Sequence, residues 1–580
     1  MEKTNLKRVA IVGAGPSGLF MFKSLLENGA REMEITLFEK KGQLGAGMPY
    51  SGEGANKEHV TNVSANEIPD LVTPVSEWIK TVPEDILASF AIARNYFNEY
   101  KVLPRLLFGK YLESQFELLL TSASLAGIKV TVFTETAIAD IEDFLEENRI
   151  QVSDDRGNQW YFEKVIICTG HSWPKKYEGK IPGYFDSPYP PAKLGIIANH
   201  PVAVKGSSLT AIDAIRTLAR TNGTFYRDEN NTLKYAVSPS SPNFKIDMHS
   251  RSGLLPAVRF HLEDSHLINS GVLTENEIEA HKAANNGFLS LDYIFEEDFK
   301  KLLAAKDPKM YGKIKDFSLE EFTDFIMDAR DREAPFELFK KEFAEAARSI
   351  KKEESIYWKE LLAILSFSLN YPAKYLSAED MMRLQQSLMP LISIVIAFVP
   401  QASAIELIAL HDAGILDIQA VGNDSEICIN EKGGIVYKYT DENQQAKEEI
   451  YETFIDCVGQ PHLSFDSFPI KGLAKNSISQ ALLAFKSDEA GADEMAAGNA
   501  KVQKSKDGNY YLQVPGITIN DHFQIVDVSG DANPRVFMMA VPYIGGYNPD
   551  YSGLDFCEEA SNRIAHEIQA NFKSTVHVIP

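Results

Sequence analysis

The chain has 580 residues, of which 44% are hydrophobic and 24% charged, and its formal net charge is -23. This length predicts several domains, and the composition is that of a folded globular protein rather than a disordered one. The acidic excess disfavours nucleic acid and anionic membranes as partners, because both bind basic surfaces.

Targeting segments and cysteine pairs offer no further clue to function. The first apolar run begins after a few polar residues, so we expect no signal peptide, and residues 391–399 are too short to cross a bilayer. The cysteines contain no CxxC pair, which predicts neither a zinc site nor a dithiol centre and fits a cytoplasmic protein. They are Cys168, Cys428, Cys457 and Cys557.

The N-terminal segment has the pattern of a nucleotide-binding βαβ unit. Residues 8–12 form an apolar strand, GAGPSGL follows, a helical pattern runs to Leu26, and Gly29 stands where a helix C-terminal glycine belongs. A second strand ends at Glu39, 21 residues after Gly18. This order predicts a parallel, doubly wound α/β sheet.

The GxGxxG motif of this unit predicts a dinucleotide site. Glycines permit the tight turn, the approach of a diphosphate and close packing of helix on strand, while the helix N-terminus offers amide donors. An acidic residue after the second strand accepts hydrogen bonds from a ribose. The predicted ligands are Gly13, Gly15, Pro16, Ser17, Gly18, Glu39 and Lys40.

Further motifs carry a resemblance to a family. GAGMPYS, HVTNVSA and PRLLFGKYL, between residues 45 and 112, resemble the FAD/NAD(P)-binding family that includes bacterial FAD-dependent urate hydroxylases and nitrosuccinate-forming aspartate N-monooxygenases. The matching segments are spread across residues 9–265 and 405–565. The resemblance implies that FAD occupies the first site, and that a C-terminal helix from about Leu554 points at the flavin. The additional FAD ligands that it implies are Gly45, Met48, Asn62, Val63, Arg105, Thr169, Gly170, Gly545 and Gly546.

Near residue 199 the pattern of strand, small-residue turn and helix begins again, in PVAVKGSSLTAIDAIRTLA. This repeat predicts a second nucleotide unit, which binds NADPH or NADH or has decayed to a structural role. Ser208 stands where the resembled family has a second glycine, and its side chain either displaces the diphosphate or donates a hydrogen bond to it. The predicted ligands are Gly206, Ser207, Ser208, Leu209 and Thr210.

Three further residues have candidate roles. Arg251 ends the expected second strand of this unit, where an arginine holds a 2′-phosphate, and therefore favours NADPH; a solvated arginine is the alternative. Arg259 is a candidate ligand of an anionic substrate, because a guanidinium fits carboxylate oxygens, and His171 is a second candidate near the flavin. An ion pair and a hydrogen-bonded loop histidine are the ordinary alternatives.

Changes of pattern along the chain predict five segments. Residues 1–195 form the N-terminal part of the FAD domain and 196–265 the NAD(P)-binding unit. Residues 266–403 form a helical insertion, 404–460 complete the NAD(P) unit, and 461–580 complete the FAD domain. The insertion either covers a substrate site or forms a dimer or partner surface.

A flavin with a nicotinamide donor passes electrons to a disulfide, an external acceptor or oxygen. The cysteine spacing disfavours the first. The resemblance implies an NAD(P)H-dependent monooxygenase that hydroxylates a small nitrogen-containing substrate with molecular oxygen through a C4a-hydroperoxyflavin. The alternatives are a flavin oxidoreductase with an external acceptor and a non-catalytic flavin-binding protein; no metal is expected.

Overall fold

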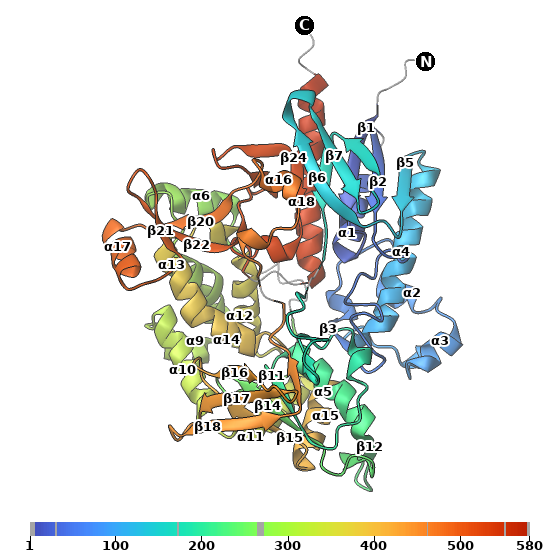
Figure 1. Cartoon of the computed structure of the whole chain (residues 1–580), viewed down its shortest axis with the longest axis vertical. Coiled ribbons are helices and arrows are strands. Elements are labelled where there is room, and N and C mark those ends of the chain that lie inside the picture. The colour runs from blue at the N-terminus through green and yellow to red at the C-terminus, as the bar shows by residue number, and fades with distance from the viewer. Residues whose placement is uncertain are drawn as a thin grey trace.

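Two parallel sheets organise the computed structural model, which describes residues 6–29, 32–170, 173–263, 272–460, 462–549 and 553–576. One sheet lies in the upper half of Figure 1 and the other in the lower half. The prediction of an α/β fold with two Rossmann-like sheets is confirmed.

The first sheet has the strand order β23-β24-β9-β1-β2-β5. Its strands run parallel except β23, which pairs antiparallel with β24. β1 and β9 lie in its centre and are largely buried, as expected of short apolar strands in a covered parallel sheet. The bounds are β1 (Lys7–Val12), β2 (Met33–Phe38), β5 (Lys129–Phe133), β9 (Lys164–Ile167), β23 (Gln524–Val526) and β24 (Ala532–Met538).

Helices and a small antiparallel sheet pack on this first sheet. The helices are α1 (Pro16–Glu27), α4 (Arg105–Leu125) and α18 (Gly553–Val576). α1 packs against α18, so the two ends of the chain meet in one unit, and both termini lie at the top of Figure 1. The small sheet packs near β1 and β9 and consists of β6 (Ile138–Phe144), β7 (Arg149–Asp154) and β8 (Gln159–Phe162).

The second sheet repeats this plan with the order β10-β19-β11-β14-β15, and all its pairs are parallel. The strands are β10 (Tyr184–Phe185), β11 (Pro201–Lys205), β14 (Lys245–Ser250), β15 (Leu416–Ala420) and β19 (Thr453–Asp456). Helices α5 (Leu209–Asn222) and α15 (Gln401–Asp412) pack together beside it. A hairpin sheet of β16 (Glu426–Ile429), β17 (Ile435–Thr440) and β18 (Ala446–Tyr451) shares a hydrophobic cluster with it. β10 belongs to this sheet, although it lies within residues 1–195, which were predicted to belong to the FAD domain.

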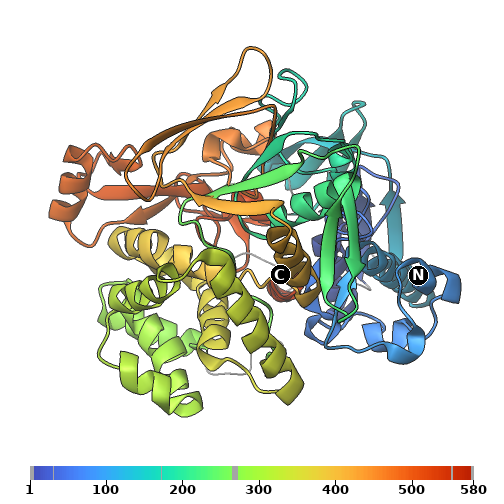
Figure 2. The same ribbon diagram turned by 90° about the horizontal axis from the view of Figure 1, so that it is seen from below.

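The chain between β14 and β15 contains a set of helices that lie together on one side of the molecule in Figure 2, away from the N-terminal unit. Two of them begin at capping boxes, formed by Thr274 with Glu277 and by Ser318 with Glu321, which satisfy the first amides of each helix. The helices are α6 (Glu275–Ala284), α7 (Leu291–Phe295), α8 (Lys301–Lys306), α9 (Pro308–Ile314), α10 (Leu319–Asp331), α11 (Pro335–Lys352), α12 (Tyr357–Ser368), α13 (Ala378–Arg383) and α14 (Met389–Val395).

Smaller elements connect these units. Strand β3 (Val60–Ser64) pairs with β4 (Val102–Pro104) in the middle of Figure 1, between the two halves. Near the C-terminus, β20 (Gln480–Ala484), β21 (Val502–Lys504) and β22 (Tyr510–Ile517) form a further sheet, and β12 (Gly223–Arg227) pairs with β13 (Leu233–Val237). The short helices are α2 (Val75–Trp78), α3 (Glu84–Ser89), α16 (Lys471–Ala474) and α17 (Asp488–Ala496). Among the described helices, none has the length and apolarity needed to span a bilayer.

Candidate functional site

A cavity of about 570 Å³ opens at the C-terminal edge of the first sheet. Its lining brings together the glycine turn after β1, the end of β2, the ends of β9 and β24, and the first turn of α18. These segments are far apart in sequence. From the first turn and its surroundings the lining residues include Gly13, Gly15, Pro16, Ser17, Glu39, Lys40, Lys41, Gly47, Met48 and Tyr50, and from the end of β9 they include Cys168, Thr169 and Gly170.

At the three glycines of the first turn, a side chain would collide with backbone or make a tight contact with it. Gly13 has a φ of +100°, and a Cβ there would lie 2.7 Å from the carbonyl oxygen of Cys168. At Gly18 a Cβ would lie 2.1 Å from the oxygen of Gly13, and at Gly15 it would lie 3.2 Å from Cα of Gly47. The turn, the helix and the facing loop are therefore packed as closely as the motif predicts.

Glu39 closes the other side of this turn. Its side chain is buried, and its carboxylate accepts hydrogen bonds from the backbone N–H of Ala14 at 2.9 Å and of Lys41 at 3.0 Å. α1 begins after Gly15, which has no side chain to bond the first amides. The cavity thus combines amide donors at a helix N-terminus with a fixed carboxylate acceptor, which suits a diphosphate joined to a sugar.

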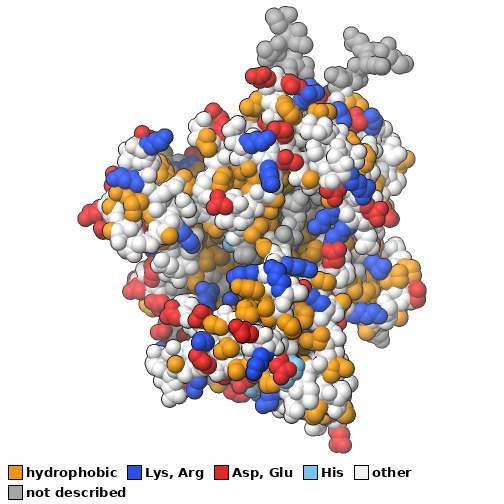
Figure 3. Space-filling model, in the orientation of Figure 1, with side chains coloured by type: hydrophobic (Ala, Val, Ile, Leu, Met, Phe, Trp, Pro, Cys, Tyr) orange, Lys and Arg blue, Asp and Glu red, His pale blue; other side chains and the backbone are white. Residues whose placement is uncertain are grey.

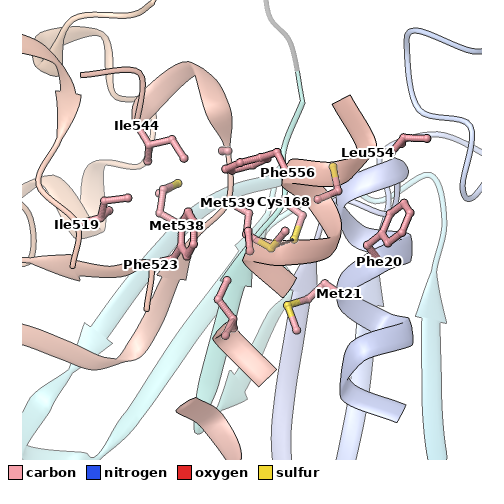
Figure 4. Close-up of a cluster of buried hydrophobic side chains, with 14 of the residues drawn as sticks. Phe20, Met21, Cys168, Ile519, Phe523, Met538, Met539, Ile544, Leu554 and Phe556 are labelled. Carbon is pink, nitrogen blue, oxygen red and sulfur yellow. Dashed lines mark hydrogen bonds between the residues drawn. The ribbon is translucent and has the colours of Figure 1, made fainter. Parts of the chain in front are cut away.

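The far wall of the cavity is apolar and rich in sulfur. Figure 4 shows Met539, which directly follows β24, close to Cys168 and to Phe556 of α18, whereas Met538 points toward Ile519, Phe523 and Ile544. The Cys168 thiol lies 3.8 Å from the Met539 sulfur, and the Cys557 thiol lies 3.3 Å from the Ser17 hydroxyl. Burial raises the pKa of Cys168 well above its ordinary value and that of Cys557 to about 11. Both thiols are therefore protonated near neutral pH, which is unsuited to thiolate redox chemistry.

The other residues that resemblance assigned to FAD have different positions. Met48, Thr169 and Gly170 line the cavity. Gly45, Gly545 and Gly546 are not in its lining, and each packs closely on other residues, since a Cβ would meet Leu112, His462 and Pro515 respectively.

The remaining FAD candidates lie toward the second unit. Asn62 and Val63 belong to β3, and the Asn62 side chain is exposed. Arg105 begins α4, donates from Nε to the oxygen of Val60 at 2.8 Å, and pairs with Asp213 of α5 at 2.6 Å. Arg105 therefore joins the first unit to the second. His171 lies outside the described residues.

The second turn repeats the geometry of the first at its start. Gly206 has a φ of +109°, and a Cβ there would lie 2.9 Å from the oxygen of Cys457, the counterpart of Cys168. Ser208 has φ and ψ of -86° and -171°, close to the -76° and -161° of Gly15. Because this is extended backbone, a serine is accommodated without strain. Its hydroxyl does not cap α5, so the first amides of α5 receive no bond from it.

Of the other predicted residues of this turn, one bonds a neighbouring segment and two belong to helix α5. Ser207 donates its hydroxyl to the oxygen of Leu254 at 2.9 Å, while Leu209 and Thr210 form the first residues of α5. Arg251 directly follows β14, as Glu39 follows β2, and is exposed. Figure 3 shows Lys and Arg side chains gathered where the lower half of the molecule meets the upper half. In a chain of net charge -23, such a group of cations provides a local attraction for phosphate.

Arg259, the candidate substrate ligand, is already paired. It is 7% exposed, and its guanidinium contacts the carboxylate of Glu67 and the backbone oxygen of Asn62. The ordinary alternative of an ion pair is what the structure contains.

Sequence reasoning missed the lining residues contributed by other segments. No local motif marks them, because they converge from the loop before β6 and β6 itself, a loop after β19, the end of β24 and the short helix that follows it, and the first turn of α18. They are Thr136, Ala137, Ile138, Ala139, Ile141, Phe468, Pro469, Ile470, Met538, Met539, Val541, Tyr543, Gly553, Leu554, Phe556 and Cys557. Only the approach of the C-terminal helix was expected, from the resemblance.

Comparison with protein families agrees with this geometry. Residues 10–172 match the model of the FAD-NAD(P)-binding family, which contains the first turn, Glu39 and the end of β9. The chain thus carries an FAD/NAD(P)-binding domain. Residues 274–396 match the YdhS-like middle domain, which corresponds to the helical insertion.

Individual proteins are similar over different lengths. YdhS of Escherichia coli (strain K12) is 25% identical over 569 residues, 97% of each chain. Flavin-containing monooxygenase 1 of Mus musculus is 29% identical over 174 residues, 28% of each chain. The solved ornithine N-hydroxylase of Kutzneria sp. 744 has a TM-score of 0.48 and 10% identity, covering 98% of this chain and 100% of that one.

Proposed function

We propose that the protein is an NAD(P)H-using flavin monooxygenase that binds FAD at the first turn and hydroxylates a small nitrogen-containing molecule, within the family of urate hydroxylases and aspartate N-monooxygenases. The observation that supports the cofactor is the cradle formed by Gly13, Gly15 and Glu39 at one cavity with the first turn of α18. When bound, FAD supplies the acceptance of hydride and the reaction with oxygen.

The residues of the first site divide the work of binding. The amides at the start of α1 hold the diphosphate, while Glu39 accepts hydrogen bonds from the ribose and is itself fixed by Ala14 and Lys41. The apolar wall near Met539 and Phe556 excludes water from the flavin end. Thr169 and Gly170 follow the end of β9 and line this cavity.

The second unit binds the nicotinamide nucleotide in this proposal. Gly206 and Ser208 give the second turn the same backbone conformation as Gly13 and Gly15 give the first. The N-terminus of α5 has no side-chain cap. Arg251 offers an exposed guanidinium at the position that reads a 2′-phosphate, so NADPH is the expected donor. The repeated geometry supports a binding role for this unit over a decayed one.

Two observations favour oxygen over a protein disulfide as the electron acceptor. The cavity thiols Cys168 and Cys557 are buried and protonated, and all four cysteines are free. Free thiols also fit a cytoplasmic protein. The sequence match to a flavin-containing monooxygenase supports the same choice.

The test is a reduction and reoxidation experiment on the FAD-loaded full chain. We expect NADPH to bleach the flavin absorbance without oxygen. When oxygen is admitted with a panel of amines, amino acids and purines, at least one compound is expected to raise oxygen consumption and yield a hydroxylated product. Bleaching followed only by peroxide release with every compound tested would favour the oxidoreductase alternative, and a flavin that NADPH does not bleach would favour the non-catalytic one.

A further inference from the structure

Strand β3 lies between the two nucleotide units, and its middle lacks regular pairing. It pairs with β4 at Val60 and Ser64, but the register shifts between these two residues. Such an irregularity redirects side chains and removes ladder partners from the backbone. Asn62 belongs to this stretch and its side chain is exposed. The backbone oxygen of Asn62 takes its partner from outside the β3–β4 ladder.

Arg259 supplies that partner from another part of the chain. Its Nη1 donates to the backbone oxygen of Asn62, and its Nη2 donates to the carboxylate of Glu67 and, at 3.3 Å, to the hydroxyl of Ser64. The side chains of Arg259 and Glu67 are 9% and 7% exposed. A guanidinium can serve these acceptors together because its donors form a rigid fork, whereas a lysine ammonium cannot reproduce that geometry.

The backbone of Arg259 is itself held at the junction with the helical insertion. Its N–H donates to the oxygen of Val399 at 2.9 Å, and the Gln401 side chain donates to the oxygen of Arg259 at 2.8 Å. Val258 and Val399 form an isolated parallel bridge. Arg259 thus stands where the chain leaves the second sheet for the insertion and returns from it.

A second arginine anchors the other end of the same strand. Arg105 donates to the oxygen of Val60 and pairs with Asp213 of α5. Arg105 and Arg259, two of the three arginines that the sequence suggested as ligands, therefore hold β3 against the second unit.

We propose that Arg259 is a positioning residue that fixes Asn62 between the two nucleotide sites, so that nicotinamide and flavin are aligned through β3. The alignment rests on the proposed function, whereas the fixation of β3 does not. In this role Arg259 contacts neither substrate nor cofactor, and its effect passes through Asn62.

The chain offers a matched control for this proposal. Arg330 is also buried, pairs with Glu342, and donates to a backbone oxygen, that of Leu255 at 3.1 Å. It has no hydrogen bond to β3 among the described residues. Arg330→Lys therefore disturbs a buried arginine of the same chemistry without disturbing Asn62.

The first measurement is amide hydrogen exchange of residues 60–67 in the FAD-loaded full chain. We expect Arg259→Lys to accelerate exchange there about tenfold, since local opening follows the loss of the bonds that hold a segment. Arg330→Lys should leave this segment unchanged. Unaltered exchange in Arg259→Lys would overturn the proposal whether or not the protein oxidises NADPH.

The second measurement is the anaerobic rate of flavin bleaching by NADPH. Arg259→Lys and Asn62→Ala should each lower the limiting rate about tenfold, because the first releases the Asn62 backbone and the second removes the exposed side chain that this backbone positions, and misplacement of reacting groups by about 1 Å is costly. The double variant should be no slower, since both changes act through one residue. The positioning role would be contradicted if the double variant lost rate by the product of the two single losses. It would also be contradicted if Arg259→Lys raised the half-saturating NADPH concentration and left the limiting rate unchanged. A wild-type flavin that NADPH does not bleach would instead refute the proposed function, and the exchange measurement would still decide the fixation.

Discussion

The two nucleotide turns begin alike and end differently. Gly13 and Gly206 have nearly the same positive φ and face the carbonyl oxygens of Cys168 and Cys457 at the ends of equivalent strands. After the second strand of each unit, however, the first unit has the buried Glu39 and the second has the exposed Arg251.

We infer from this difference that the shared backbone provides phosphate binding in general, while the residue after the second strand selects the nucleotide. A fixed carboxylate accepts hydrogen bonds from free ribose hydroxyls, and a guanidinium attracts a phosphate at the same place. One fold repeated in one chain therefore serves two dinucleotides in our account.

The sharpest way to break the comparison is a matched pair of glycine substitutions. Gly13→Ala and Gly206→Ala each place a Cβ within 3 Å of a carbonyl oxygen at a positive φ, and each should cost about 1–3 kcal/mol of unfolding free energy. The melting temperatures of the two variants should fall by similar amounts. Only Gly13→Ala should lose FAD on gel filtration, while Gly206→Ala keeps FAD but loses its reduction by NADPH. Loss of FAD from a folded Gly206→Ala protein would contradict the separation of the sites.

Substitution of Glu39 tests the residue that we infer selects the nucleotide in the first unit. Glu39→Gln replaces a carboxylate oxygen by a donor beside the Ala14 and Lys41 amides, and should weaken FAD binding by about 1.5–3 kcal/mol, or roughly 10- to 150-fold. Titration of the apoprotein with FAD measures it. Glu53→Gln is the control, because Glu53 is exposed and pairs with Lys41 through its side chain. Equal losses in both variants would refute a specific role for Glu39.

Substitution of Arg251 tests the residue that we infer selects the nucleotide in the second unit, and its expected effect is smaller. Arg251→Ala should raise the NADPH dissociation constant about tenfold, about 1.4 kcal/mol, and leave NADH unchanged. Anaerobic titrations with each nucleotide provide the comparison. Arg227, an exposed arginine of β12 whose side chain donates to the backbone oxygen of Asn231, gives the control variant Arg227→Ala. If the affinities for NADPH and NADH fall together, Arg251 does not read the 2′-phosphate.

The smallest effect is expected at Ser208, where the two turns differ in residue type but share the backbone conformation of Gly15. Ser208→Gly should change the NADPH dissociation constant by about threefold or less, because serine already has the extended backbone of Gly15 and glycine replaces a polar N-terminal residue at a cost of a few tenths of a kcal/mol. The same titration decides it. A tenfold gain in affinity would mean that the hydroxymethyl group obstructs the diphosphate.

Local sequence patterns predicted the parts of the site that lie close together along the chain. The glycine turn and Glu39 were predictable because their spacing follows directly from a βαβ unit. Arg105 and Arg259 were not, since their partners Asp213 and Glu67 lie 108 and 192 residues away. Nothing local distinguishes an arginine that holds a neighbouring unit from one that holds a ligand. The sulfur-rich wall of Met539 and Cys557 likewise required the return of the C-terminus to the first sheet.

A crystal structure of the full chain grown with FAD and NADP⁺ tests the central claim most directly. Our account predicts the FAD diphosphate at the start of α1 with its ribose on Glu39, and the 2′-phosphate of NADP⁺ beside Arg251. FAD bound away from the Gly13 turn, or NADP⁺ bound at that turn in place of FAD, would contradict it.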